Sequence, residues 1–282
     1  LFNDFSVTFQ DADPKGNIEL TELRKTLFSA GTPGDAYLNK TQLNGAMYQR
    51  VPKNGRDVFL PKPFIFSVST PAKIGPSCNV VFYDNAGEHF RPDQDVVKDP
   101  GAMHVGAASG ILFLLDPFHV TEWRKAIMEI SDDPQLKGKN VIDDQEVLLA
   151  ELKRRVFELR GLATNLRCDI PMAVVIPKMD AWHELLDENI ESPVREGQLD
   201  LGAIDRNSTA MRNLIRGICP HILASAESFS SNVKYFAVSA FGHTPVEVKK
   251  GNEVFIVPDP QQLTACYTEH PMLWLLSKTV PE

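Results

Sequence analysis

The sequence lacks the patterns that mark several large classes of protein. Its four cysteines form no CxxC pair, so neither a structural zinc site nor a disulfide framework is expected. It contains no apolar run of 18 residues and no cleavable signal pattern, which predicts a cytoplasmic protein without a membrane span. We find no internal repeat and no low-complexity tract. These absences leave a globular protein held together by an ordinary hydrophobic core.

Acidic residues outnumber basic residues, and the formal net charge is −8. Nucleic acids and anionic membranes attract clustered lysine and arginine, so we expect no nucleic-acid partner. The 282 residues are 43% hydrophobic and 23% charged, which is enough to build a sizeable core, and we expect a single domain over 1–282. The chain opens with Leu1 inside an apolar segment, so we interpret it as part of a longer polypeptide.

Short apolar runs alternate with longer helical patterns along the chain. Most of the runs are continuous, as in strands that are buried on both faces of a parallel sheet. The predicted strands are Phe5–Phe9, Phe64–Thr70, Val80–Tyr83, Ile111–Leu115, Ala173–Ile176 and Tyr235–Val238. The predicted helices are Ile18–Ser29, Ile142–Leu159, Thr209–Phe229 with an interruption at Pro220, and Gln261–Lys278. This alternation predicts an α/β fold, namely a three-layer α/β/α sandwich around a mainly parallel sheet.

Three segments stand outside this alternation. Residues 30–62 are rich in Gly, Pro, Asn and Lys, which predicts a long irregular loop. Residues 187–208 and 241–260 are predicted to be further surface insertions.

Polar motifs follow four of the predicted strands, where ligands bind in open α/β sheets. The motifs are "DNAGE" after Val80–Tyr83, "DPF" after Ile111–Leu115, "PKMD" after Ala173–Ile176 and "SAFG" after Tyr235–Val238. Their order, DxxG, a variant of NKxD and then SA, resembles the Ras-like GTPase superfamily. The strings "VVFYDNAGEHF", "GILFLLDPF", "AVVIPKMD" and "PMLWLL" are similar to the bacterial double-GTPase group. The resemblance implies a Ras-like fold, GTP or GDP as ligand, and Mg²⁺ as its companion ion.

The resemblance also implies roles on the phosphate side of such a site. Asp84 would hold Mg²⁺ through a water, and Thr41, in the long loop, is our candidate for the switch threonine that ligates the same ion. Gly87 would donate its backbone N–H to the γ-phosphate, an approach that a side chain would block. Glu88 stands where many members have the glutamine that orients the attacking water. A carboxylate there could act as a base, but it would also repel the γ-phosphate.

Four further residues would contact the guanine base in the same resemblance. Asp180 would accept hydrogen bonds from guanine N1 and N2, which selects GTP over ATP, and Lys178 would pack its stem along the base. Ser239 and Ala240 would offer backbone N–H groups to guanine O6. The asparagine of NKxD is replaced by Pro177, which cannot tie the base-binding loop to a phosphate loop through a side-chain amide.

No GxxxxGK[ST] phosphate loop occurs in the sequence; the nearest string, "GAMHVGAAS" at 101–109, lacks the lysine. The family pattern places that loop before a strand and helix like those at the start of this chain, so we expect it upstream of Leu1. Without its amide nest and lysine, nucleotide affinity should fall severely. We therefore expect magnesium-dependent GTP hydrolysis of the complete protein and not of this chain.

Two alternative interpretations stay open. The first is a GTPase-like module that binds no nucleotide and acts through a protein partner. The second is calcium binding, because "DADPKGNIELTE" follows the EF-hand loop pattern, with Asp11, Asp13 and Glu22 at ligand positions. Lys15 occupies a position where an oxygen ligand belongs, and the preceding "FSVTF" is typical of a strand rather than of an entering helix.

Overall fold

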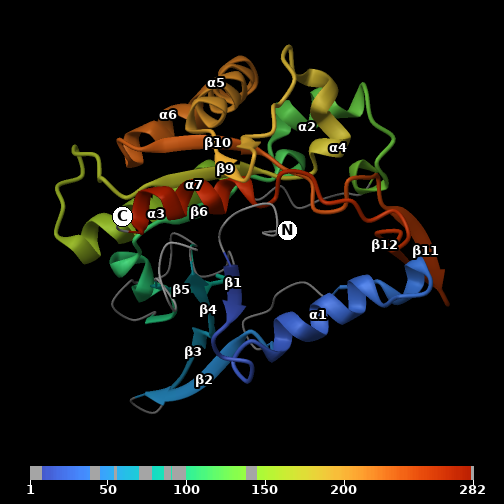
Figure 1. Cartoon of the computed structure of the whole chain (residues 1–282), viewed down its shortest axis with the longest axis horizontal. Helices are drawn as coiled ribbons and strands as arrows, with labels where there is room; N and C mark the ends of the chain where they lie inside the picture. Colours follow the sequence, from blue (N-terminus) through green and yellow to red (C-terminus); the bar gives the residue numbers. More distant parts are fainter. Residues whose placement is uncertain are drawn as a thin grey trace.

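The computed structural model describes residues 8–38, 45–53, 56–69, 78–85, 90, 100–137 and 145–280 (Figure 1). Helices and strands are both abundant, so the chain is a mixed α/β protein, as predicted. Short 3-10 helices join the main elements, at Pro33–Asp35, Pro100–Ala107, Pro117–His119, Pro134–Leu136 and His183–Leu185. No helix within these described ranges has the length and apolar character needed to cross a bilayer.

One sheet in the described part of the chain is parallel. It contains β6 (Ile111–Leu114), β7 (Met172–Ile176) and β10 (Val233–Ala237) in the order β10-β7-β6. All five residues of the central strand β7 are buried, which explains why its sequence is a continuous apolar run. The three strands run in the same direction, so their carboxyl ends meet at one edge of the sheet.

Helices pack on both faces of this parallel sheet (Figure 1), although Leu112 and Leu114 of β6 stay exposed. Core residues of one face pack with α2 (Thr121–Met128), α3 (Gln145–Arg160) and α6 (Pro220–Phe229). The other face packs on α7 (His270–Thr279) and on Ile204 near the start of α5 (Leu201–Ile218). Pro220 separates α5 from α6, so the predicted interruption at this residue is confirmed.

The N-terminal part of the chain is built differently. β1 (Thr8–Asp11), β4 (Pro63–Ser69) and β5 (Cys78–Tyr83) form an antiparallel sheet in the order β1-β4-β5. In sequence, α1 (Ile18–Phe28) and a hairpin of β2 (Tyr48–Lys53) and β3 (Arg56–Pro61) lie between β1 and β4, and α1 runs across the lower right of Figure 1. The described strands therefore do not form the mainly parallel sheet that the sequence predicts.

The predicted loops and insertions contain regular structure. The prediction of an irregular loop over 30–62 is wrong over β2 and β3, because Val51, Val58 and their neighbours pair in an antiparallel ladder. The segment 187–208 holds the small hairpin of β8 (Val194–Arg195) and β9 (Gln198–Leu199) and the first turns of α5. The segment 241–260 holds the hairpin of β11 (Val246–Lys250) and β12 (Glu253–Val257).

Candidate functional site

The carboxyl edge of the parallel sheet gathers four polar side chains. Asp116 follows β6 by two residues, Lys178 and Asp180 follow β7, and Ser239 follows β10 by two residues. Three of them, Lys178, Asp180 and Ser239, were predicted as site residues from the sequence. Asp116 was not, although it opens the "DPF" motif that ends the strand. The edge of the sheet brings all four together because parallel strands end on the same side.

Asp116 and Lys178 form an ion pair across this edge. The Lys178 ammonium donates to Asp116 Oδ2 at 2.8 Å and lies 4.2 Å from the centre of the Phe118 ring. The other carboxylate oxygen of Asp116 accepts the backbone N–H of Phe118 at 2.9 Å, capping the short helix Pro117–His119. Each charged side chain is about one-quarter exposed, so the pair is only partly shielded from water. The ion pair and the Phe118 ring therefore fix the ammonium end of the Lys178 side chain at this edge.

Asp180 and Ser239 form the second pair of the site. The Ser239 hydroxyl donates to Asp180 Oδ1 and accepts the backbone N–H of Gly242 at 2.8 Å. Ser239 is almost fully buried and exchanges two backbone hydrogen bonds with Cys266, so its position is fixed. Asp180 is half-buried, and its Oδ2 atom has no hydrogen bond in the described part of the structure. The carboxylate is thus oriented by one oxygen, which leaves the other as an acceptor.

The loop that carries Lys178 and Asp180 is itself constrained. Lys178 has a φ of 60°, a left-handed conformation that is uncommon for a residue with a side chain. The Trp182 indole donates to the carbonyl of Pro177 at 2.7 Å, and the N–H of Met179 donates to the carbonyl of Val238 at 3.0 Å. These bonds hold the strained turn against β10. Backbone strain of this kind persists where surrounding structure enforces it, and it is concentrated at binding sites.

Asp133 adds a buried carboxyl group to the surroundings of the site. It is 1% exposed and caps the short helix Pro134–Leu136 through the N–H of Gln135 at 2.8 Å. Burial raises the pKa of Asp133, and the charge of Asp180 raises it further, while the Gln135 hydrogen bonds and the Lys178 ammonium oppose this shift. Sequence reasoning missed Asp133 because it follows no strand. The burial that raises the pKa of Asp133 results from tertiary packing, which a local sequence pattern does not show.

Of the predicted phosphate-side residues, Asp84 lies in the described part of the chain, and it follows a strand of the antiparallel sheet rather than of the parallel sheet. Asp84 is exposed just after β5 in the antiparallel sheet, where its backbone carbonyl accepts a 3.5 Å hydrogen bond from the Tyr48 hydroxyl. Thr41, Gly87 and Glu88 lie outside the described residues. Ala240 follows Ser239 directly and is exposed, as a backbone contact to a ligand requires.

The residues of the calcium-loop alternative lie in a turn between β1 and α1. Asp11 Oδ1 accepts hydrogen bonds from the N–H of Asp13 and the amide of Asn17, and Asp13 Oδ1 accepts the N–H of Gly16 at 3.0 Å. Glu22 pairs with Lys25 at 2.7 Å on the exposed side of α1. A strand precedes this turn, whereas an EF-hand loop follows a helix. No group of three or more potential metal ligands occurs among the described residues.

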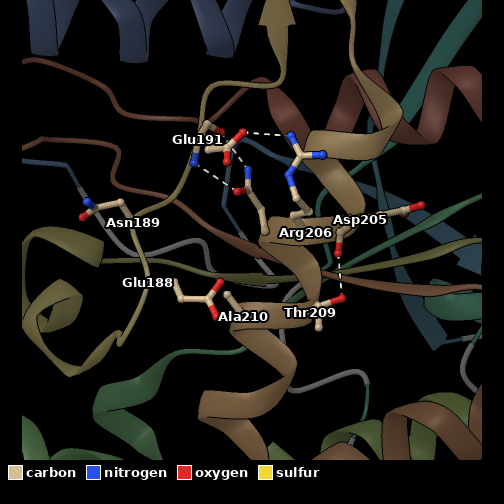
Figure 2. A pocket seen from close by; sticks show the side chains of 8 residues that line it. Glu188, Asn189, Glu191, Asp205, Arg206, Thr209 and Ala210 are labelled. Atoms are coloured by element: carbon tan, nitrogen blue, oxygen red, sulfur yellow. Dashed lines mark hydrogen bonds and ion pairs between the residues drawn. The ribbon is translucent and has the colours of Figure 1, made fainter.

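A shallow hollow of about 300 Å³ lies between the 188–191 segment and the first half of α5 (Figure 2). Two of its lining residues bond to Glu191: Arg206 pairs with its carboxylate at 2.9 Å, and Asn207 exchanges two hydrogen bonds with its backbone. Asp205, which also lines the hollow, pairs with Lys234 of β10 at 2.7 Å. The contacts of Glu191 tie the segment to α5, and we assign the hollow a structural role.

The carboxyl edge of the parallel sheet therefore offers a carboxylate acceptor, an ammonium with an aliphatic stem and an exposed backbone turn. This set of groups is suited to holding a flat polar ring by hydrogen bonds. Comparison of the chain with protein-family models, with curated proteins and with solved structures gives no match.

Proposed function

We propose that the chain binds guanine nucleotides at the carboxyl edge of the β10-β7-β6 sheet. The observation that carries this proposal is the Asp180 carboxylate, which Ser239 orients through one oxygen. Guanine presents two donors side by side, at N1 and N2, and a carboxylate accepts from both. Adenine has no such pair of donors, so Asp180 would favour GTP over ATP. Lys178 would line the base with its stem, and the N–H of Ala240 would bind O6, because the N–H of Ser239 already donates to the carbonyl of Cys266.

The remainder of the proposal rests on the resemblance to Ras-like GTPases. The protein would have a three-layer Ras-like sandwich, of which the parallel sheet with helices on both faces would be one part. Asp84 and Thr41 would hold Mg²⁺, Gly87 would contact the γ-phosphate, and Glu88 would lie beside the attacking water. This chain has no GxxxxGK[ST] motif, so we expect weak nucleotide binding and no hydrolysis from it.

A second candidate is a GTPase-like interaction module without nucleotide, acting on a protein partner. Two observations favour it. Pro177 removes the side-chain amide that would join the base-binding loop to a phosphate loop, and the Lys178 ammonium is already paired with Asp116. In this alternative the hydrogen-bonded pairs of the site stabilise the loops at the sheet edge and bind no ligand. The two candidates differ in whether the chain distinguishes GTP from ATP.

The test is a titration of the chain with fluorescently labelled GTP and ATP, with and without Mg²⁺. We expect GTP to bind more tightly than ATP. Asp180→Asn should weaken GTP binding by roughly tenfold to a hundredfold, because a hydrogen bond to a charged group contributes about 1.5–3 kcal/mol. The amide of this variant also carries a donor, so xanthosine triphosphate, with an acceptor at position 2, should bind the variant better than GTP does.

Asp169→Asn is the matched control, because it removes the same charge from a side chain that is 97% exposed and outside the site. It should leave both affinities unchanged. Equal and negligible binding of GTP and ATP by the unmodified chain would contradict the proposal for this chain and favour the interaction module. A gain of xanthosine triphosphate binding in Asp180→Asn cannot result from misfolding, so it separates a direct contact from a general loss of structure.

A further inference from the structure

The backbone around Asp116 fixes the direction of its carboxylate. Strand β6 pairs with β7 as far as Leu115, so Asp116 is the first residue beyond the ladder. Pro117 follows and restricts the backbone at the start of a short 3-10 helix. Asp116 Oδ1 accepts the N–H of Phe118 at 2.9 Å and caps this helix. The other carboxylate oxygen, Oδ2, is therefore presented in a fixed direction at the edge of the sheet.

The Lys178 ammonium pairs with this second oxygen. Lys178 Nζ lies 2.8 Å from Asp116 Oδ2 and 4.2 Å from the centre of the Phe118 ring, so a carboxylate and an aromatic face attract the same charge. His119 Nε2 lies 4.0 Å from Oδ2, which is beyond hydrogen-bond distance. Within the described ranges Lys178 has no other ion-pair partner. Asp116 and Phe118 thus determine where the ammonium lies.

A second carboxylate stands near the same lysine. Asp180 follows Lys178 by two residues, and its Oδ2 atom has no hydrogen bond among the described residues. Lys178 and Asp180 act in opposite directions on the pKa of the buried Asp133, so both charges lie near this group. The flexible four-carbon stem of lysine allows its ammonium to reach more than one neighbour. The ammonium nevertheless pairs with Asp116 and not with Asp180.

The order of the strands keeps the two charges apart. Strand β7, which carries the turn of Lys178 and Asp180, lies between β6 and β10. Lys178 is bound by Asp116, which follows β6, and Asp180 is bound by Ser239, which follows β10. The two side chains are thus held by neighbours on opposite sides of β7. Loss of the Asp116 charge would remove the attraction that keeps the ammonium on the β6 side.

We propose that Asp116 is a positioning residue of the base site, because it holds the Lys178 ammonium away from Asp180. The inference rests on the guanine-binding function proposed above. An ammonium on Asp180 Oδ2 would compete with the N1 and N2 donors of guanine for the oxygen that Ser239 leaves free. It would also neutralise the charge that strengthens these hydrogen bonds. Asp116 keeps the carboxylate available and does not touch the ligand.

The first variant is Asp116→Asn, which removes the charge but keeps an oxygen for the N–H of Phe118. Guanosine is the probe, because it carries the base without a phosphate that could itself attract Lys178. The ammonium should move to Asp180 and weaken guanosine binding by about fivefold, the upper range for a partly exposed ion pair. The measurement is an NMR titration of the labelled chain at low salt. An unchanged affinity overturns the proposal.

Lys178→Met separates positioning from a general structural role. Methionine keeps an unbranched apolar side chain and removes the ammonium. Adding Asp116→Asn to this variant should change the affinity for guanosine no further, because no cation is left to move onto Asp180. An equal loss in both backgrounds would show that Asp116 supports the loop directly, and it would contradict the proposal.

Asp200→Asn is the matched control. Asp200 Oδ1 also caps a helix, through the N–H of Ala203 at 3.0 Å, and its Oδ2 also pairs with a basic side chain, Arg195, at 3.4 Å. It precedes α5 and follows no strand of the parallel sheet. Guanosine binding should therefore be unchanged. A loss equal to that of Asp116→Asn would show that removal of any such carboxylate has the same effect, and it would count against the proposal.

A crystal structure of Asp116→Asn without ligand tests the movement of the ammonium separately. Lys178 Nζ should lie within about 4 Å of a carboxylate oxygen of Asp180. An ammonium that stays beside Phe118 would overturn the positioning role. The two proposals fail in different ways. If the unmodified chain binds neither guanosine nor GTP, the guanine-binding function is wrong and the inference falls with it. If the unmodified chain binds guanosine and Asp116→Asn binds it equally well, only the role of Asp116 is wrong.

Discussion

The two halves of the chain bury their residues to very different extents. From Val105 onward, one large cluster and one smaller cluster contain almost all the buried apolar side chains. Between residues 8 and 85, the described buried apolar side chains are Ala36, Tyr48, Pro61, Phe64 and Val68. None of the eleven residues of α1, all of them described, is buried. We therefore expect the C-terminal half to contribute most of the free energy of unfolding, because the N-terminal half buries few apolar side chains.

The same contrast divides the candidate site. Lys178, Asp180 and Ser239 are fixed by hydrogen bonds on the well-packed parallel sheet, with Asp116 beside them. Asp84 is exposed just after β5, a strand in which half-buried and exposed residues alternate. Rigid elements hold a binding group more accurately than exposed loops do. We therefore expect Lys178, Asp180 and Ser239 to be ordered in the absence of any ligand.

The largest predicted effect is on the C-terminal core. Trp182 and Trp123 are fully buried and meet edge to face at 5.6 Å between ring centres. Trp182→Ala should lower the free energy of unfolding by about 3–5 kcal/mol, because it opens a cavity and removes the bond to Pro177. Phe9 is half-buried and packs on Phe66 in the N-terminal sheet. Phe9→Ala should lower the free energy of unfolding, measured with urea, by clearly less than Trp182→Ala does. Equal losses would remove the contrast between the two halves.

The second prediction concerns pH and the first turn of α7. Burial lowers the pKa of His270 to about 4, although Glu269 Oε1 lies 3.7 Å from its Nε2 atom. Between about pH 6.5 and pH 4, the unfolded chain binds a proton at this histidine and the folded chain does not. The free energy of unfolding should therefore fall by about 3 kcal/mol as the pH is lowered through this window.

His270→Gln should remove this part of the pH dependence, measured by urea unfolding at several pH values. The control is His221→Gln, which removes an exposed histidine from α6. An unchanged slope in His270→Gln would mean that other groups cause the acid sensitivity.

A smaller effect is expected in the loop that supports Ser239. Gly242 has a φ of 72°, and a Cβ atom there would lie 1.9 Å from the carbonyl oxygen of Thr264. Gly242→Ala should lower the free energy of unfolding by about 1–3 kcal/mol through strain and displacement of this loop. It should also weaken any guanine selectivity, because the N–H of Gly242 holds the Ser239 hydroxyl. Gly251→Ala is the control, since its φ is also positive but no atom lies within 4 Å of the added Cβ.

The smallest effect is expected in α1. Leu23 is half-buried on the more covered face of this helix, so Leu23→Ala should cost only about 1 kcal/mol or less in urea unfolding. Amides of α1 should also exchange with solvent sooner than those of α5, which packs on the parallel sheet. Protection of α1 equal to that of α5 would show that the N-terminal half is as firmly packed as the C-terminal half.

The sequence predicted the C-terminal half better than the N-terminal half. The run Ala173–Ile176 was recognisable as a buried parallel strand because it is apolar throughout, and Pro220 marked the boundary of two helices. The hairpin of β2 and β3 was missed because residues 30–62 contain many loop-forming residues, and its strands are stabilised by pairing with each other. The strained turn at Lys178 and the burial of Asp133 could not be predicted from the neighbouring residues in the sequence.

The sequence by itself determined which strands are buried and which polar residues follow them, because apolar periodicity and turn residues act over a few positions. It could not show which of those residues meet. The tertiary structure decided that Lys178 pairs with Asp116 and Asp180 with Ser239, and that the two leucines of β6 stay exposed. These contacts join positions up to 62 residues apart, and only the parallel arrangement of β6, β7 and β10 brings them to one edge.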